Sequence, residues 1–194
     1  MDIFKMAENN RQAGWNILEK TGVIRAWESI GAVVFPVGSL KTGLMMKSLD
    51  IDLHIYTEKL SVAESFAVMQ GLTVNCPFRE VQFRNLADTE EECFEWHAGY
   101  EDSEGNHWKF DMIHIRKGSR YDGVVEKVTD ALIRKLTPEQ RRIILQIKFD
   151  RPDTVQIPGI EIYHAVLAGG VKDYKELTEW RKTSPLINSL EWMP

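Results

Sequence analysis

Apolar side chains recur at helical spacing over the first thirty residues and again after residue 120, whereas the segment between them is β-like. A period near 3.6 predicts a helix, and a period of two, or a short β-branched run, predicts a strand. The predicted helices cover residues 2–20, 22–30, 39–47, 61–70, 121–136, 138–149, 160–167 and 172–182. The predicted strands cover residues 32–37, 50–57, 79–86, 93–100 and 107–116.

Local signals sharpen several of these boundaries. Ser61 and Glu64 form a capping-box pattern at the start of one helix, and Thr137-Pro138 opens another. The polar turn at 102–106 separates two apolar strands, which is typical of a hairpin. Strands mixed with helices come first and helices alone come last, so the order predicts an α+β core over residues 1–118 and a helical C-terminal part over residues 119–194.

The most informative motif lies between the first two predicted strands. Gly38-Ser39 follows the apolar run, and ten residues separate it from Asp50 and Asp52 at the start of the next strand. Side chains alternate along a strand, so the two carboxylates share one face and Ile51 takes the other. Carboxylates bind Mg²⁺, and a Gly-Ser turn that opens a helix can present N–H groups to phosphate. The motif therefore predicts metal-assisted transfer from a nucleoside triphosphate.

A third carboxylate lies sixty residues later in a largely apolar strand. A two-metal site generally uses more than two acids, since one ion lies under the triphosphate and the other under the attacking hydroxyl. Asp111 is isolated among apolar neighbours, where an unpaired carboxylate is costly to bury. Either it faces solvent, or it completes a metal site with Asp50 and Asp52. The upstream acid pair favours the second interpretation.

These residues resemble a known superfamily, the DNA polymerase beta-like nucleotidyltransferases. The resemblance is greatest to its small bacterial members, the minimal and the aminoglycoside nucleotidyltransferases. It covers residues 31–57 well and residues 107–116 loosely. The matching positions are Gly38, Ser39, Gly43, Asp50, Asp52 and Asp111.

The resemblance implies a short mixed β-sheet flanked by helices and followed by a helical part. Asp50 and Asp52 would hold two Mg²⁺ ions, with Mn²⁺ as a substitute. Asp111 would hold the acceptor-side ion and act as general base, which makes all three acids both catalytic residues and metal ligands. Gly38 and Ser39 would bind the terminal phosphates of the nucleotide.

The chain departs from the family pattern just after the Gly-Ser turn. Small members commonly carry Arg at the positions of Leu40 and Thr42. Lys41 is therefore assigned to nucleotide binding, with Lys47 as a second source of charge, although a lysine lacks the bidentate fork of an arginine. These departures leave the metal site intact and weaken the expected phosphate site.

Other polar residues near the motif carry weaker signals. His54 continues the face of the acid pair and is interpreted as a packing or surface residue, with contact to the metal or the acceptor as the alternative. The hairpin histidines, among them His97, are interpreted as structural. Lys109 shares the face of Asp111 and could contact phosphate or pair with that carboxylate. Glu95 is a weak candidate for an extra acid. The apolar stripe with Tyr163 is interpreted as core, with the acceptor pocket as the alternative.

Composition narrows the location and the partners. The formal net charge of −5 gives no general attraction to nucleic acid and argues against a long nucleic-acid partner. Cys76 and Cys93 form neither a disulfide framework nor a zinc pattern and fit a reduced compartment. The N-terminal residues lack an apolar signal core, and no segment has the roughly 18 apolar residues of a membrane span. We therefore expect a cytoplasmic protein without a membrane partner.

The sequence predicts a Mg²⁺-dependent nucleotidyltransferase that moves a nucleoside monophosphate from a triphosphate to a hydroxyl and releases pyrophosphate. The acceptor remains open among a small molecule, a protein side chain and an RNA end. The base of the nucleotide is also open, with ATP among the candidates. The rival hypothesis is a non-catalytic module on the same fold, for nucleotide sensing or protein interaction in a toxin–antitoxin or regulatory assembly.

Overall fold

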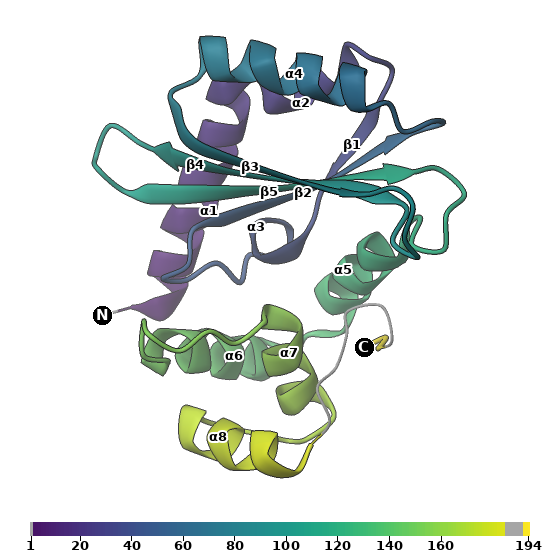
Figure 1. The fold of residues 1–194 in the computed structure, drawn as a ribbon. Helices are drawn as coiled ribbons and strands as arrows, with labels where there is room; N and C mark the ends of the chain where they lie inside the picture. Colours follow the sequence, from purple (N-terminus) through teal and green to yellow (C-terminus); the bar gives the residue numbers. More distant parts are fainter. Residues whose placement is uncertain (1, 185–191) are drawn as a thin grey trace.

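A computed structural model describes residues 2–184 and 192–194 (Figure 1). Its helices are α1 (Ile3–Thr21), α2 (Val23–Glu28), α3 (Gly38–Thr42), α4 (Val62–Asn75), α5 (Val124–Lys135), α6 (Pro138–Asp150), α7 (Gly159–Leu167) and α8 (Tyr174–Thr183). Its strands are β1 (Val33–Pro36), β2 (Asp50–Thr57), β3 (Phe78–Leu86), β4 (Cys93–Glu101) and β5 (His107–Arg116).

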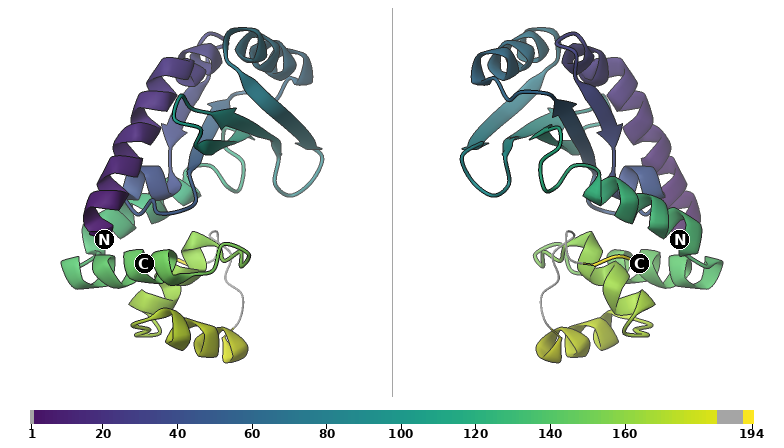
Figure 2. Two further views of the ribbon diagram at one scale, coloured as in Figure 1. Left: turned by 90° about the vertical axis from the view of Figure 1, so that its left-hand side faces the viewer. Right: turned by 90° about the vertical axis from the view of Figure 1, so that its right-hand side faces the viewer.

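The five strands form one mixed sheet in the order β1-β2-β5-β4-β3. Only the β2–β5 pair is parallel, and the three other pairs are antiparallel. Helices α2 and α4 cover one face of the sheet, while α3 and α5 lie on the other face, toward α6, α7 and α8 (Figures 1 and 2). The predicted α+β fold with a short mixed sheet and a helical end is confirmed.

The covered face of the sheet supports the main apolar core. Ile51, Leu53 and Ile55 point to this face from β2, and all three are fully buried. They pack with apolar residues of α1, α2 and α4, including Trp27 and Leu72. Burial of such side chains stabilises the fold by about 1.5–3 kcal/mol each, so β2 is a rigid element. That rigidity extends to the acids on its opposite face.

A second apolar cluster lies among α6, α7 and α8. It also includes Ala7 of α1 and Leu44 and Met46, which follow α3. Residues from the first third of the chain therefore pack directly against the helical part. The division at residue 118 stays a prediction. Among the described helices, none is both long enough and apolar enough to cross a membrane.

Most element boundaries follow their sequence signals. Thr137-Pro138 opens α6 as predicted, and a full capping box is present, since Thr137 accepts from the backbone of Gln140 and the Gln140 side chain accepts in return. The helix predicted over residues 39–47 is shorter than expected and ends at Thr42. Gly43 terminates it in the left-handed region at φ 70°. Glycine adopts this conformation without a Cβ clash, so the next residues leave the helix and become buried.

An arginine of α6 holds the end of α3 in place. The guanidinium of Arg141 donates to the backbone carbonyls of Thr42 at 2.9 Å and Gly43 at 2.7 Å. Charged hydrogen bonds to carbonyls that a helix end leaves unpaired are among the stronger polar contacts. The helical part therefore fixes the position of α3, which carries the Gly38-Ser39 motif.

Candidate active site

Parallel pairing of β2 with β5 brings the predicted acids together. Asp52 lies directly opposite Asp111, and Asp50 lies opposite Lys109. Residues paired in this way point to the same face of a sheet. All three acids are partly buried on the face that α3 and α5 share. The structure thus places three carboxylates on two neighbouring strands, as the sequence predicted.

Gly38 lies close to Asp52 across this face. Its φ is +63°, and a Cβ built on it would lie 2.1 Å from Oδ2 of Asp52. No side chain fits into that space, and the backbone conformation also favours glycine. Close approach to the carboxylate is therefore a geometric reason for a glycine at this position, independent of any phosphate.

Burial and charge repulsion raise the pKa of two of the acids. The pKa of Asp52 rises to about 7, chiefly through burial and then through the charges of Asp50 and Asp111. Burial and the charge of Asp111 also raise the pKa of Asp50. Lys148 and Lys109 oppose both shifts. Within the described residues, neither carboxylate forms a hydrogen bond or ion pair with another side chain, so a bound cation would relieve the repulsion.

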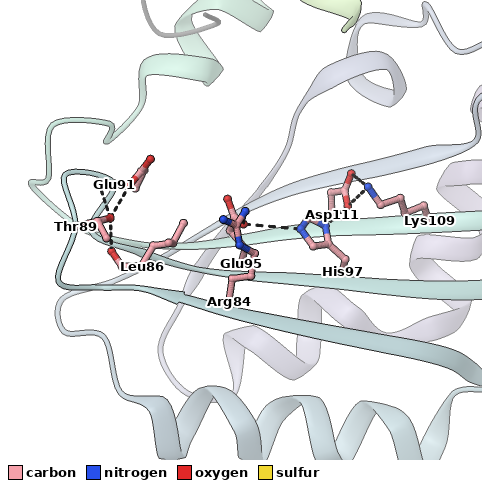
Figure 3. Close-up of polar contacts among 8 residues, drawn as sticks. All are labelled: Arg84, Leu86, Thr89, Glu91, Glu95, His97, Lys109 and Asp111. Atoms are coloured by element: carbon pink, nitrogen blue, oxygen red, sulfur yellow. Dashed lines mark hydrogen bonds and ion pairs between the residues drawn. The ribbon is translucent and has the colours of Figure 1, made fainter. Parts of the chain in front are cut away.

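Asp111 has two cationic or polar neighbours (Figure 3). The ammonium of Lys109 donates to the Asp111 carboxylate at 2.9 Å. Oδ1 of Asp111 also forms a short hydrogen bond with Nδ1 of His97. The position of His97 differs from the packing role expected from the sequence. A signal was present, because the turn at 102–106 sets the hairpin register in which His97 lies opposite Asp111.

The three acids line a cleft of about 590 Å³ whose other wall comes from α6 and α7. Lys148 of α6 donates to Oγ of Ser39 and to the carbonyl of Leu44, both at 2.8 Å, and lies 3.2 Å from Oη of Tyr163. Ser39 is also 3.3 Å from the same tyrosine hydroxyl. A polar cluster of Ser39, Lys148 and Tyr163 therefore faces the acids across the cleft.

Arg151, at the end of α6, adds a second positive charge to this wall. It is only 8% exposed and donates to Oγ of Ser48 at 2.8 Å. Its Nε is buried without a hydrogen-bond partner among the described residues. Sequence reasoning missed both Lys148 and Arg151. Neither residue has a local signal, since they reach the cleft only through the packing of α6 against α3.

Three other candidates make no direct polar contact with the acids among the described residues. Lys41 is exposed on α3 and is not among the residues that line the cleft. His54 is buried and bonds to Glu126 of α5 at 3.0 Å, consistent with packing. Glu95 pairs with Arg84 at 2.9 Å on the open part of the same sheet face. The role of Lys41 in nucleotide binding stays a prediction.

The acids suit a divalent metal by their chemistry. Three carboxylates supply hard oxygen ligands, and the raised pKa of Asp52 shows that the site favours added positive charge. Within residues 2–184 and 192–194, however, no three His, Cys, Asp or Glu side chains already form a metal cluster. Asp111 is instead held by Lys109 and His97. By their chemistry the three carboxylates fit a divalent metal, and Asp50, Asp52 and Asp111 would hold it.

Substitution of Gly38 tests the close approach to Asp52. We expect Gly38→Ala to displace the Asp52 carboxylate and to abolish Mn²⁺ binding, measured by isothermal titration calorimetry. Gly31→Ala is the matched control, because Gly31 also has a positive φ, 81°, but open space around its Cβ position. The control should lose about 1 kcal/mol of stability and retain the metal. Equal metal affinity in both variants would contradict the steric role of Gly38.

The raised pKa of Asp52 predicts a pH-dependent effect of Asp52→Asn. A carboxyl with a raised folded-state pKa binds more protons in the folded state, so stability falls as pH rises from about 4 to 7. Asparagine cannot ionise and avoids this loss. In EDTA, urea unfolding should show the variant to be about 2–4 kcal/mol more stable than the wild type near pH 8 and similar near pH 4.

Mg²⁺ should narrow the difference in stability near pH 8, because the wild type, with one more carboxylate at the site, gains more charge compensation than the variant. Asp88→Asn, at an exposed position, should change stability little at either pH. A destabilised Asp52→Asn protein near pH 8 in EDTA would refute the electrostatic account.

Comparison with known proteins places the fold. No protein-family model and no curated protein matches this sequence. In three dimensions, the Cid1 poly(U) polymerase with MgGTP bound matches with a TM-score of 0.56 and 18% identity, over 84% of this chain and 50% of its own. A cytoplasmic RNA terminal U-transferase matches with a TM-score of 0.53 and 16% identity, over 84% of this chain and 48% of its own. A chain of the GLD-2/RNP-8 complex matches with a TM-score of 0.58 and 12% identity, over 96% of this chain and 73% of its own.

These identities are low, so the likeness concerns the fold alone. The chain spans about half the length of the Cid1 protein that it matches. The likeness to these nucleotide-transferring polymerases and this terminal transferase supports the predicted nucleotidyltransferase-like fold. The resemblance to small bacterial members stays a prediction. The chain therefore has a nucleotidyltransferase-like fold, with three acids on the strands that the sequence predicted.

Proposed function

We propose that this protein is a Mg²⁺-dependent nucleotidyltransferase that transfers a nucleoside monophosphate from a triphosphate to a hydroxyl. The observation that carries the proposal is the placement of Asp50, Asp52 and Asp111 on one sheet face, opposite a wall that carries Lys148 and Arg151. One cleft is therefore lined both by carboxylates that can bind metal ions and by positively charged side chains that can bind phosphate. The cytoplasm is its proposed location.

The acid side of the cleft would hold the metal ions. Asp50 and Asp52 would bind both ions, and Asp111 would bind the ion on the acceptor side. When bound, Mg²⁺ neutralises the charge that develops on the α-phosphate and on the departing pyrophosphate. The raised pKa of Asp52 supports this role, since the site is electrostatically incomplete without added positive charge.

The opposite wall would bind the triphosphate. Lys148 already bonds to the Ser39 hydroxyl, so its ammonium and that hydroxyl can contact the same phosphate group. Arg151 is buried nearby, and its Nε has no hydrogen-bond partner among the described residues, so its guanidinium adds positive charge to this wall. Lys148 and Arg151 would supply the positive charge that arginines supply in small family members at the positions of Leu40 and Thr42. The proposed phosphate site therefore includes Gly38 and Ser39 and depends on α6 more than on Lys41.

Asp111 would take the proton of the acceptor hydroxyl. His97 and Lys109 hold its carboxylate by hydrogen bonds and so restrict its orientation. The acceptor would approach over β4 and β3, because α3 and α5 cover the same face of the sheet near β2 (Figure 1). The class of acceptor remains open among small molecules, protein side chains and RNA ends. The names of the matched polymerases and terminal transferase make RNA the first acceptor to test.

The test uses four α-labelled triphosphates with Mg²⁺, offered with short RNA or with a metabolite extract. We expect label transfer and pyrophosphate release by the wild type, and a loss of at least about a thousandfold for Asp50→Asn combined with Asp52→Asn. Asp88→Asn is the control for loss of a surface charge. If the wild type releases no pyrophosphate with any acceptor yet binds Mg²⁺ and triphosphate, the non-catalytic module is the better explanation.

Lys148→Met tests the proposed phosphate wall. The variant keeps the length of the side chain and removes its charge, so triphosphate affinity should fall about 10- to 100-fold. Lys172→Met is the matched control, because Lys172 is exposed and does not line the cleft. Binding is measured by fluorescence with a labelled triphosphate. Equal affinity of the two variants would exclude Lys148 from the nucleotide site.

A further inference from the structure

Strand β3 forms an open edge of the sheet. Its only strand partner among the described residues is β4, so its outer backbone groups are not paired with another strand. Such an edge can accept a strand from another chain unless its side chains prevent this. The side chains of β3 therefore decide whether the edge is protected or ready to pair.

Strand β3 carries three charged residues, and two of them, Glu80 and Arg84, are symmetric in position and opposite in sign, while Arg79 precedes them. Glu80 and Arg84 flank Gln82 at equal distances along the chain, and Val81 and Phe83 flank it immediately. Glu80, Gln82 and Arg84 point to the polar face, and Figure 3 shows Arg84 there beside Glu95. A bulge between Phe78 and Glu80 interrupts the strand before this segment. The regular part of the edge thus begins at Glu80.

This order is complementary to itself in one antiparallel register. With Gln82 opposite Gln82 of a second copy, Glu80 lies opposite Arg84 at both ends and Val81 lies opposite Phe83. Centring the pairing on Val81 or on Phe83 places each charge opposite a neutral residue instead. Opposite charges and apolar pairs both stabilise facing strands, so the register centred on Gln82 is favoured.

Apolar exposure continues onto the other side of the same edge. Val81 is 37% exposed, and on α4 Val62 and Phe66 are 43% and 46% exposed. The ring centroids of Phe66 and Phe83 are 4.7 Å apart, so the strand and the helix form one apolar surface. Pairing of two β3 strands would bring two such surfaces together, with the ion pairs on the opposite side.

We propose that two copies of this chain associate through β3 in the antiparallel register centred on Gln82. The two sheets then form one continuous sheet, and the two-fold axis passes through it at Gln82. Directly opposed residues share a face, so both clefts open on the same side of the dimer. The interface lies at the far edge of the sheet from β1, and it uses no residue assigned to the cleft.

Charge-reversal variants test the register as well as the association. Glu80→Arg and Arg84→Glu each place like charges opposite each other and should raise the dimer dissociation constant at least about tenfold. A one-to-one mixture of the two variants restores an opposite charge at every position and should form a heterodimer. Sedimentation velocity over a concentration series measures all three samples and the wild type.

Glu28→Arg is the control, since it makes the same charge change at an exposed position on α2 and should dimerise like the wild type. Circular dichroism checks that each variant is folded. A wild type that stays monomeric over the whole series overturns the proposal. A dimer that persists in either single variant also overturns the proposal, because the interface then lies elsewhere. A one-to-one mixture of the two variants that remains monomeric overturns it as well.

Discussion

Parallel pairing of β2 with β5 is the constraint on which the site depends. It places Asp52 opposite Asp111 on two strands that cannot move apart, because the apolar residues on their other face are buried in the main core. Negative charges held this close on a partly buried surface repel each other, and burial together with this repulsion raises the pKa of Asp52. Cations around the cleft, supplied by the chain or bound from solution, offset it.

The two ends of the site are built by different forces. Hydrogen bonding within the sheet sets the positions of the acids. Contacts between distant parts of the chain set the phosphate wall, where Lys148 reaches Ser39 and Arg141 holds the end of α3. A change in how α6 packs would therefore alter the proposed phosphate wall and leave the acids in place. This difference explains why the two ends were not equally predictable from sequence.

The sequence predicted nearly every helix and strand, because periodicity and caps are local. Strand β2 has the predicted bounds, and α6 has the predicted cap. The error at α3 arose because Gly43 ends the helix in a left-handed conformation, although the residues beyond it are good helix formers. His97 was overlooked although the hairpin register places it opposite Asp111, since counting from the turn requires the strands to be paired first.

By itself, the sequence determined that Asp50 and Asp52 share a face, since side-chain alternation is a property of the extended backbone. It also supplied Asp111 as the third acid, but only the sheet order made that residue a neighbour of the pair. Tertiary structure alone decided that Lys148 and Arg151 complete the cleft. Each lies about a hundred residues from its partner near α3, and their approach depends on apolar packing spread over α1, α6 and α7. No local pattern encodes a contact of that kind, because its position is set by the sum of many distant contacts.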